Sequence, residues 1–177
     1  MRKLAKEELG RIGVDEFRTA AKIPLVVVLD DIRSLNNVGS AFRTSDAFRV
    51  EKIYLCGITG TPPHRDIQKT ALGATDSVEW EYIENTEELI TKQKREGYTV
   101  LAVEQAEGSK MLDHFSIAPS KKYSLVFGNE VFGVDQRVVD LCDDVIEIPQ
   151  EGTKHSLNIS VSMGIVLWDF WKSLRHY

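Results

Sequence analysis

Three polar segments of the chain combine amide, carboxylate, hydroxyl and guanidinium side chains with glycine-containing turns. They span residues 30–44, 127–135 and 148–160. Each segment follows a short apolar run typical of a buried β-strand. Open α/β sheets bind their ligands at the carboxyl ends of the strands. We therefore expect the three segments to meet at one edge of a sheet and to form the functional site there.

The first segment places an arginine on a helix that follows two asparagines. A buried stripe of the helix predicted over 38–48 contains Val38, Ala41, Phe42 and Ser45. Helical geometry puts Arg43 about 100° away from that stripe, and its forked guanidinium suits a phosphate. Asn36 or Asn37 could cap the helix, whose N-terminus attracts anions. Taken alone, a helix cap and a surface ion pair are the plainer interpretations of Asn37 and Arg43.

The second segment is a glycine-flanked turn between a predicted strand and a predicted helix. Gly128 would let a ligand approach the backbone closely, and Gly133 indicates a residue with positive φ. Glu130 is the only carboxylate in the turn 128–133. It could anchor an arginine or a loop amide, or it could be an ordinary exposed glutamate. Asp135 is expected to cap the helix that follows.

The third segment leads into the last helix. Pro149 fixes the strand exit, Gly152 allows a tight loop, and Ser156 is placed to cap the helix. His155 beside Ser156 does not indicate a hydrolase, because adjacent helical residues diverge and the sequence contains no GxSxG motif. A GxGxxG motif after the first strand and a P-loop motif are also missing from the sequence, so dinucleotide and P-loop phosphate binding lose their usual support.

The elements that must position these segments alternate along the chain. Apolar runs predict strands over 24–29, 52–56, 78–82, 99–103, 123–127 and 145–148. Amphipathic segments predict helices over 38–48, 66–72, 86–96, 136–142 and 156–174. This alternation predicts an α/β fold with a mostly parallel sheet and flanking helices.

Composition limits the possible classes of protein. The chain has 177 residues, 42% hydrophobic and 28% charged, as expected for one globular domain. Its formal net charge of -5 means that any nucleic-acid surface must be a local patch. We expect no membrane span, no secretory signal and no metal site. Cys56 and Cys142 are isolated, which fits buried thiols of a cytoplasmic protein.

The last predicted helix has two apolar stripes on nearly opposite sides. One contains Leu157, Val161, Ile165 and Trp168, and the other contains Ile159, Met163, Val166 and Phe170. One stripe can pack on the sheet, whereas the other needs a second partner. We favour a homodimer, with a deeply internal helix in a monomer as the alternative.

Both ends of the chain carry basic residues. Residues 1–23 are expected to form a basic helical extension before the domain at 24–177, with a net charge of +2 over residues 1–22. Leu4, Ile12 and Phe17 could form the apolar stripe of this helix. Lys172, Arg175 and His176 form a second small basic cluster.

In this order and spacing, the three segments resemble the three motifs of the SpoU/TrmH family of RNA ribose 2′-O-methyltransferases, within the SPOUT superfamily. The matching motifs lie at 37–44, 126–133 and 148–161, and the resemblance covers about 24–171. It implies a C-terminal trefoil knot built from about residue 98 onward, an exception to the rule that chains do not thread their loops. It also implies a homodimer in which Arg43 reaches the site of the facing subunit.

The resemblance further implies S-adenosylmethionine as cofactor and no metal. The residues implied to hold this cofactor are Gly128, Ile148 and Leu157, with the loop after Val103 lining the same pocket. The implied catalytic set is Arg43, Asn37, Glu130, Ser156 and Asn158. Arg43 would act as a base or as a phosphate clamp, and we favour the clamp because a guanidinium keeps its proton. The other four residues would organise loops and ribose by hydrogen bonds.

The RNA substrate is left open by the resemblance. Transfer RNA is our first expectation because the short architecture resembles tRNA-modifying members, with ribosomal RNA as the alternative. Since only about 23 residues precede the first strand, RNA would be held by the dimer, by Arg33, Arg43 and Lys154, and by the basic ends. A non-catalytic RNA-binding relative and a small-molecule α/β enzyme are the competing classes.

Overall fold

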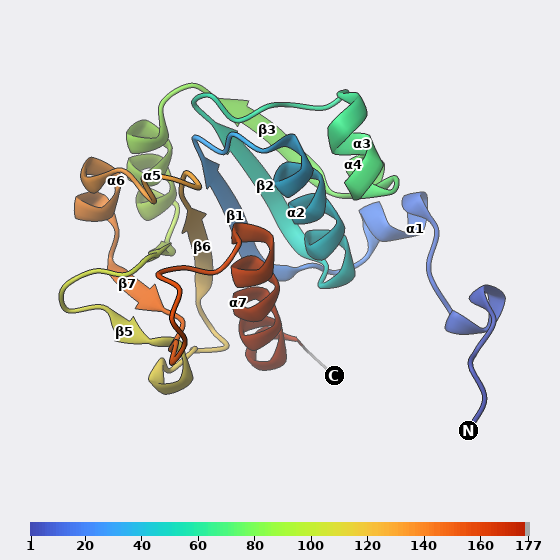
Figure 1. Cartoon of the computed structure of the whole chain (residues 1–177). Helices are drawn as coiled ribbons and strands as arrows, with labels where there is room; N and C mark the ends of the chain where they lie inside the picture. Colours follow the sequence, from blue (N-terminus) through green and yellow to red (C-terminus); the bar gives the residue numbers. More distant parts are fainter. Residues whose placement is uncertain (176–177) are drawn as a thin grey trace.

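The computed structural model, which describes residues 1–175, has a single seven-stranded sheet in the order β3-β2-β1-β6-β4-β7-β5 (Figure 1). All the paired strands are parallel, which confirms the predicted sheet. The strands are β1 (Ile23–Asp30), β2 (Val50–Cys56), β3 (Glu79–Ile83), β4 (Tyr98–Val103), β5 (Lys110–Met111), β6 (Lys122–Phe127) and β7 (Asp144–Glu147). Strand β5 was not predicted, because two exposed residues carry no hydrophobic pattern.

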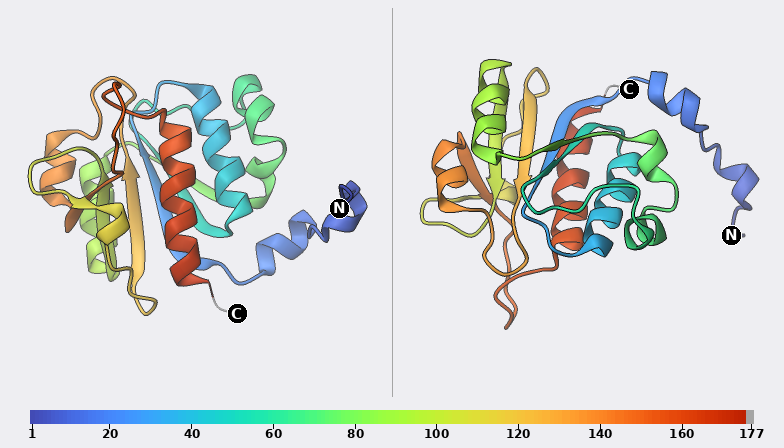
Figure 2. Two further views of the ribbon diagram at one scale, coloured as in Figure 1. Left: turned by 60° about the horizontal axis from the view of Figure 1, so that its bottom comes forward. Right: turned by 90° about the horizontal axis from the view of Figure 1, so that it is seen from above.

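Helices cover both faces of the sheet (Figures 1 and 2). One face carries α2 (Leu35–Ala47), α3 (Arg65–Ala71), α4 (Ala74–Ser77) and α7 (Ile159–Leu174). The other carries α5 (Thr86–Arg95) and α6 (Gln136–Leu141). A short 3-10 helix, η2 (Leu112–His114), precedes β6. Two buried clusters result, one on each side of the sheet.

Strand β1 shows why the central strands are almost continuously apolar. Its Leu25, Val27 and Leu29 belong to the cluster beneath α2 and α7, whereas Val28 belongs to the cluster beneath α5 and α6. Because both faces are covered, successive side chains are buried whichever way they point. The polar residues that follow such a strand are therefore the first ones free to reach a ligand.

The N-terminal extension is not a single helix, contrary to our prediction. It consists of a 3-10 helix, η1 (Lys6–Leu9), and α1 (Val14–Thr19), and it leads away from the body of the molecule (Figure 1). Gly10 ends η1 in a left-handed conformation with φ of 58°, which breaks the helical path. Phe17 is buried, but Leu4 is exposed. The domain boundary after residue 23 stays a prediction, and His176 lies outside the described residues.

Two helices, α2 and α7, begin three residues away from the predicted start. Helix α2 is capped by Ser34, whose hydroxyl accepts a hydrogen bond from the backbone N–H of Asn37 at 3.3 Å, so neither Asn36 nor Asn37 is the cap. Helix α7 is capped by Asn158 instead of Ser156. The Asn158 carboxamide oxygen accepts both the backbone N–H and the hydroxyl of Ser160, which fixes the helix start two residues later.

Asp135 caps α6 as predicted, accepting the backbone N–H of Arg137 at 2.9 Å. At the other end of α6, Cys142 is a free thiol, and so is the fully buried Cys56. Burial raises the pKa of each thiol to about 12. Both cysteines are therefore uncharged packing residues at neutral pH.

Helix α7 has the two-sided character that its sequence predicts. Met163, Val166 and Phe170 are buried against the sheet. The opposite side leaves Val161, Ile165 and Trp168 exposed by 50%, 40% and 50%. The described part of the chain therefore covers only one of the two stripes. No helix within residues 1–175 combines the length and apolar character needed to span a membrane.

Candidate functional site

The turn after β6 holds the loop after β1, which brings the first two polar segments together. One carboxylate oxygen of Glu130 accepts the backbone N–H of Arg33 at 2.9 Å. The other accepts the backbone N–H of Ser34 at 3.0 Å and the side-chain amide of Asn37 at 2.9 Å. Glu130 thus anchors loop amides, one of the alternatives that the sequence left open.

These donors decide the charge of Glu130. Its partial burial raises the pKa of the carboxyl, but hydrogen bonds from Arg33, Asn37, its own backbone and Ser34 outweigh that effect. The pKa of Glu130 therefore lies below its ordinary value. The carboxylate is ionised at neutral pH, and each oxygen serves as an acceptor.

The loop after β1 is fixed by further side chains. The Asn129 side-chain amide donates to the carbonyl of Asp31 at 2.8 Å, and the hydroxyl of Thr59 accepts the backbone N–H of Ile32 at 2.9 Å. Asp31 has a φ of 54°, an uncommon backbone conformation for a residue with a side chain. Its carboxylate accepts the backbone N–H of Ile58 at 2.9 Å. The loop is therefore preorganised, because the backbone of each residue from 31 to 34 has a hydrogen-bond partner.

The β6 turn is equally constrained. Asn129 and Gly133 exchange two backbone hydrogen bonds of 2.9 and 2.8 Å. Gly133 has the predicted positive φ, at 71°. A Cβ on Gly128 would overlap the backbone of Gly133 and Val134. The turn itself thus requires glycine at 128, and ligand approach, the reason expected from the sequence, is not needed to explain it.

Beside this turn lies a cavity of about 440 Å³, a size typical of small-molecule sites. The predicted residues that line it are Val103, Gly128, Glu130, Ile148, Ser156, Leu157 and Asn158. Asn37 lies outside the lining, where its side-chain oxygen accepts a hydrogen bond from the Asn158 side chain at 3.4 Å. The second and third polar segments therefore line one cavity at the carboxyl edge of the sheet, and Glu130 and Asn158 hold the first segment beside it.

Arg43 is the predicted site residue that the structure leaves apart. Its side chain is exposed on α2, does not line the cavity, and has no hydrogen bond or ion pair with residues 1–175. Directly after this helix, Phe48 packs against Trp168 and Trp171 of α7, so α2 borders the helix with the uncovered apolar stripe. Within one chain, Arg43 is thus available to another molecule.

The lining of the cavity combines negative charge with apolar walls. Glu104, Glu130 and Glu147 contribute carboxylates, and among the described residues neither lysine, arginine nor histidine lines the cavity. Phe127 and Ile148 provide apolar surface. The sequence prediction missed Glu104, although its place directly after β4 is a signal that could have identified it. Its carboxylate accepts the backbone N–H of Val134 at 3.1 Å. The arrangement suits a ligand that joins an apolar ring to a positive charge.

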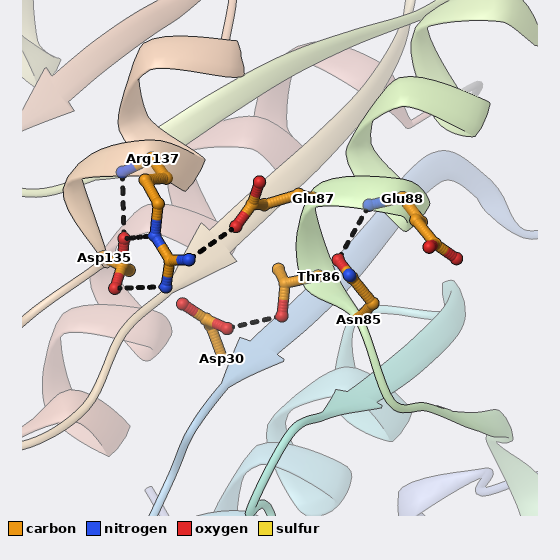
Figure 3. A network of polar contacts seen from close by, with 7 residues as sticks. All are labelled: Asp30, Asn85, Thr86, Glu87, Glu88, Asp135 and Arg137. Atoms are coloured by element: carbon orange, nitrogen blue, oxygen red, sulfur yellow. Dashed lines mark hydrogen bonds and ion pairs between the residues drawn. The ribbon is translucent and has the colours of Figure 1, made fainter.

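A second polar network lies at the same edge, on the side of α5 and α6 (Figure 3). The Thr86 hydroxyl donates to the buried carboxylate of Asp30 at 2.5 Å. Arg137 binds Asp135 and reaches Glu87 at 3.3 Å. Burial raises the pKa of Asp30, with a smaller opposing effect of Thr86. Residues 1–175 contain no group of three or more His, Cys, Asp or Glu side chains placed to hold a metal.

Comparison with known proteins gives consistent matches. The sequence profile of the SpoU rRNA Methylase family matches residues 24–168. A 23S rRNA (guanosine-2′-O-)-methyltransferase RlmB of Neisseria meningitidis is 29% identical over 153 residues, which cover 86% of this chain and 60% of that relative.

Solved structures of similar fold include a TrmH/SpoU tRNA modifying enzyme of A. aeolicus, with a TM-score of 0.80 and 26% identity over 90% of this chain and 80% of that one. An AdoMet-bound rRNA methyltransferase of Sinorhizobium meliloti has a TM-score of 0.79 and 29% identity, covering 92% of this chain and 60% of that one. The chain thus spans less than two thirds of the length of several relatives it matches.

Proposed function

The chain belongs to the SpoU rRNA methylase family, and from this premise we propose that it transfers a methyl group from S-adenosylmethionine to a ribose 2′-hydroxyl of RNA. The observation that carries the proposal is the cavity that the second and third polar segments line, with the first segment held beside it by Glu130 and Asn158. A non-catalytic RNA-binding protein would not need such a cavity beside its RNA surface. A small-molecule enzyme would not need an exposed arginine outside its own cavity.

The cavity residues fit the proposed cofactor. Its lining includes three glutamates and no cation among the described residues, a charge balance that suits a sulfonium and an amino group. The apolar side chains of Val103, Ile148 and Leu157 suit an adenine ring, and the backbone at Gly128 offers polar atoms. We assign these four residues to cofactor binding.

When bound, S-adenosylmethionine supplies a methyl group that is activated by a sulfonium; transfer to the 2′-oxygen leaves a neutral thioether and releases one proton. The chain contributes mainly positioning. Glu130 fixes the loop before α2, and its partner Asn37 contacts Asn158. Ser156 and Asn158 line the cavity and can orient the ribose by hydrogen bonds. Arg43 would hold a phosphate of the RNA and so set the direction of attack.

Arg43 serves this role in a dimer. The uncovered stripe of α7 supports a homodimer, because exposed Val161, Ile165 and Trp168 would otherwise remain in water. Helix α2, which carries Arg43, packs beside α7, so dimerisation through α7 would bring Arg43 toward the facing subunit. We also propose the trefoil knot for the segment from about residue 98, on the basis of family membership.

The substrate that the comparisons favour is ribosomal RNA. The matching family profile and the N. meningitidis relative carry rRNA in their names, whereas the A. aeolicus structure is named for tRNA modification. Transfer RNA, our first expectation, is therefore the second candidate. RNA as substrate, together with two free cysteines, favours the cytoplasm as the place of action.

The test is transfer of labelled methyl from S-adenosylmethionine to unmodified rRNA and tRNA supplied separately, followed by nucleoside mass analysis. We expect a 2′-O-methylated nucleoside from the rRNA pool. Appearance of the label only in tRNA would reverse the choice of substrate. Failure to label either RNA, with cofactor binding intact, would contradict the proposed reaction.

Arg43→Ala separates the proposed phosphate role from a structural one. We expect it to lower methyl transfer by at least about a hundredfold, in line with the loss of a charge-assisted contact that orients the reactants. Cofactor binding by calorimetry and the dimer mass by light scattering should not change. Arg95→Ala, at an exposed arginine on the opposite layer, is the matched control. Loss of cofactor binding or dimerisation in Arg43→Ala would contradict the role.

A further inference from the structure

The β6 turn presents an aromatic ring to solvent at the edge of the cavity. Phe132 is 85% exposed and its neighbour Val131 is 64% exposed, and both residues line the cavity. A phenylalanine ring normally contributes most of its stabilisation when it is buried. Isolated exposed apolar residues are common, but here two adjacent ones stand at the proposed reaction site. Their place indicates a contact with a ligand.

The ring is held by a rigid support. The carboxamide oxygen of Asn129 accepts the backbone N–H groups of Val131 at 2.9 Å and of Phe132 at 3.2 Å. The paired backbone hydrogen bonds between Asn129 and Gly133 close the turn behind them. A ligand that packs on Phe132 would thus order only the side chain, so little binding free energy is lost to conformational entropy.

The charges around the ring point to the class of ligand. On one side Glu130 lies in the same turn and holds the backbone of Arg33, an exposed cation. On the other side the cavity is lined by carboxylates. A nucleotide would meet both requirements, with its phosphate toward Arg33 and its base over the apolar ring, whereas the acidic cavity is unfavourable for the phosphate itself.

We propose that Phe132 is a stacking platform for the unpaired base of the nucleotide whose ribose is methylated. This inference rests on the proposed function. The 2′-oxygen must reach the cavity, and the base attached to the same ribose then lies at the cavity edge, where Phe132 stands. Aromatic side chains are the common stacking partners of unpaired RNA bases, because every base presents a π-face to an aromatic ring.

The experiment uses the RNA fragment that contains the nucleotide mapped by the methyl-transfer assay. Two synthetic versions are compared, one with the target base and one abasic at that nucleotide. Phe132→Leu retains an apolar side chain but removes the ring, and Phe132→Trp retains an aromatic face. With the intact base, we expect Phe132→Leu to lower kcat/KM by on the order of tenfold and Phe132→Trp to stay within about threefold of the unaltered protein. With abasic RNA, Phe132→Leu and the unaltered protein should not differ.

Three controls make the result specific. Binding of S-adenosylmethionine, measured by calorimetry without RNA, and the dimer mass should be the same in the Phe132 variants. Leu72→Ala removes another exposed apolar side chain, 66% exposed at the end of α3 and away from the cavity, and should not alter kcat/KM. The unaltered protein assayed with abasic RNA measures how much kcat/KM falls from the missing base alone.

Each other outcome overturns the inference in a recognisable way. If Phe132→Leu lowers kcat/KM equally on intact and abasic RNA, the ring does not act through the target base. Weaker cofactor binding would assign Phe132 to the adenine, and a changed dimer mass would assign it to the subunit contact. An unchanged kcat/KM would exclude stacking. If the unaltered protein methylates neither RNA pool, the proposed function fails and this inference fails with it.

Discussion

The two polar networks at the carboxyl edge of the sheet shift the pKa values of their central carboxylates in opposite directions. Glu130, on the cavity side, accepts two backbone N–H groups and one side-chain amide. Asp30, on the side of α5 and α6, is 4% exposed and accepts a hydroxyl from Thr86 (Figure 3). The pKa of Glu130 lies below its ordinary value because its hydrogen bonds outweigh burial. The pKa of Asp30 lies above it because burial prevails and Asp31 adds repulsion.

This difference distinguishes a carboxylate whose charge positions a loop from a buried carboxylate whose charge has no such use. The charge of Glu130 is used, because its donors belong to the loop that leads into α2 and to the first turn of α2. The charge of Asp30 is costly, since it lies between other acidic groups and receives little compensation. The same chemical change, replacement of a carboxylate by its amide, should therefore have opposite effects on stability at the two positions.

The largest expected effect is at Glu130. In Glu130→Gln, an NH2 group replaces one acceptor oxygen, so it faces a backbone N–H and leaves it without a partner. We expect the free energy of unfolding in urea to fall by about 1–3 kcal/mol at pH 7. Methyl transfer should fall at least about tenfold, because the loop before α2 and the side chain of Asn37 are released.

The pH dependence of this loss has a definite sign. Because folding lowers the pKa of Glu130, its contribution is present above the ordinary carboxyl pKa and is lost as pH falls through the lowered value. The difference between the unaltered protein and Glu130→Gln should therefore shrink at acidic pH. A difference that is the same at every pH would show that shape, not charge, explains the effect.

The second prediction concerns the start of α7, where sequence and structure disagree. Asn158 caps the helix and also contacts Asn37 of the cavity-side network, whereas Ser156 has no cap role. Asn158→Ala should lower the free energy of unfolding by about 1 kcal/mol, and Ser156→Ala should leave it within about 0.5 kcal/mol. Urea titration of both variants distinguishes them. A larger loss in Ser156→Ala would restore Ser156 as the cap.

The sequence predicted the repeating features of the fold and the segments that form the site. Buried strands and amphipathic helices have a period that survives in the sequence, so the parallel sheet and both stripes of α7 could be predicted. Glu130 could be nominated because its turn contains no other carboxylate. What could not be predicted depends on competition between nearby groups. Ser34 and Asn158 cap helices in place of equally suitable neighbours, a choice made by loop geometry.

Contacts between segments far apart in the chain were the other limit. The sequence gives no sign that Glu104 supports the backbone of Val134, or that Thr86 binds Asp30, because both pairs form only after the strands are ordered in the sheet. The sequence correctly predicted that Gly128 has no room for a side chain, but it attributed this to an approaching ligand. In the structure the backbone of the same turn fills the space. Local sequence patterns thus identify candidate residues more reliably than they identify the partners of those residues.

The smallest expected effect, and the one of opposite sign, is at Asp30. Folding raises the pKa of this carboxyl, so between the ordinary and the raised value the folded state holds more protons and stability falls as pH rises. Asp30→Asn stays neutral, and its side-chain oxygen can still accept the Thr86 hydroxyl. The variant should match the unaltered protein near pH 4 and become more stable toward pH 8, by less than about 1 kcal/mol. Urea titrations at several pH values measure this trend. Glu87→Gln, which removes the exposed ion pair to Arg137 in the same network, is the control and should show no measurable change. If Asp30→Asn is instead destabilised at pH 8, the buried charge is stabilised by its surroundings after all, and the contrast with Glu130 disappears.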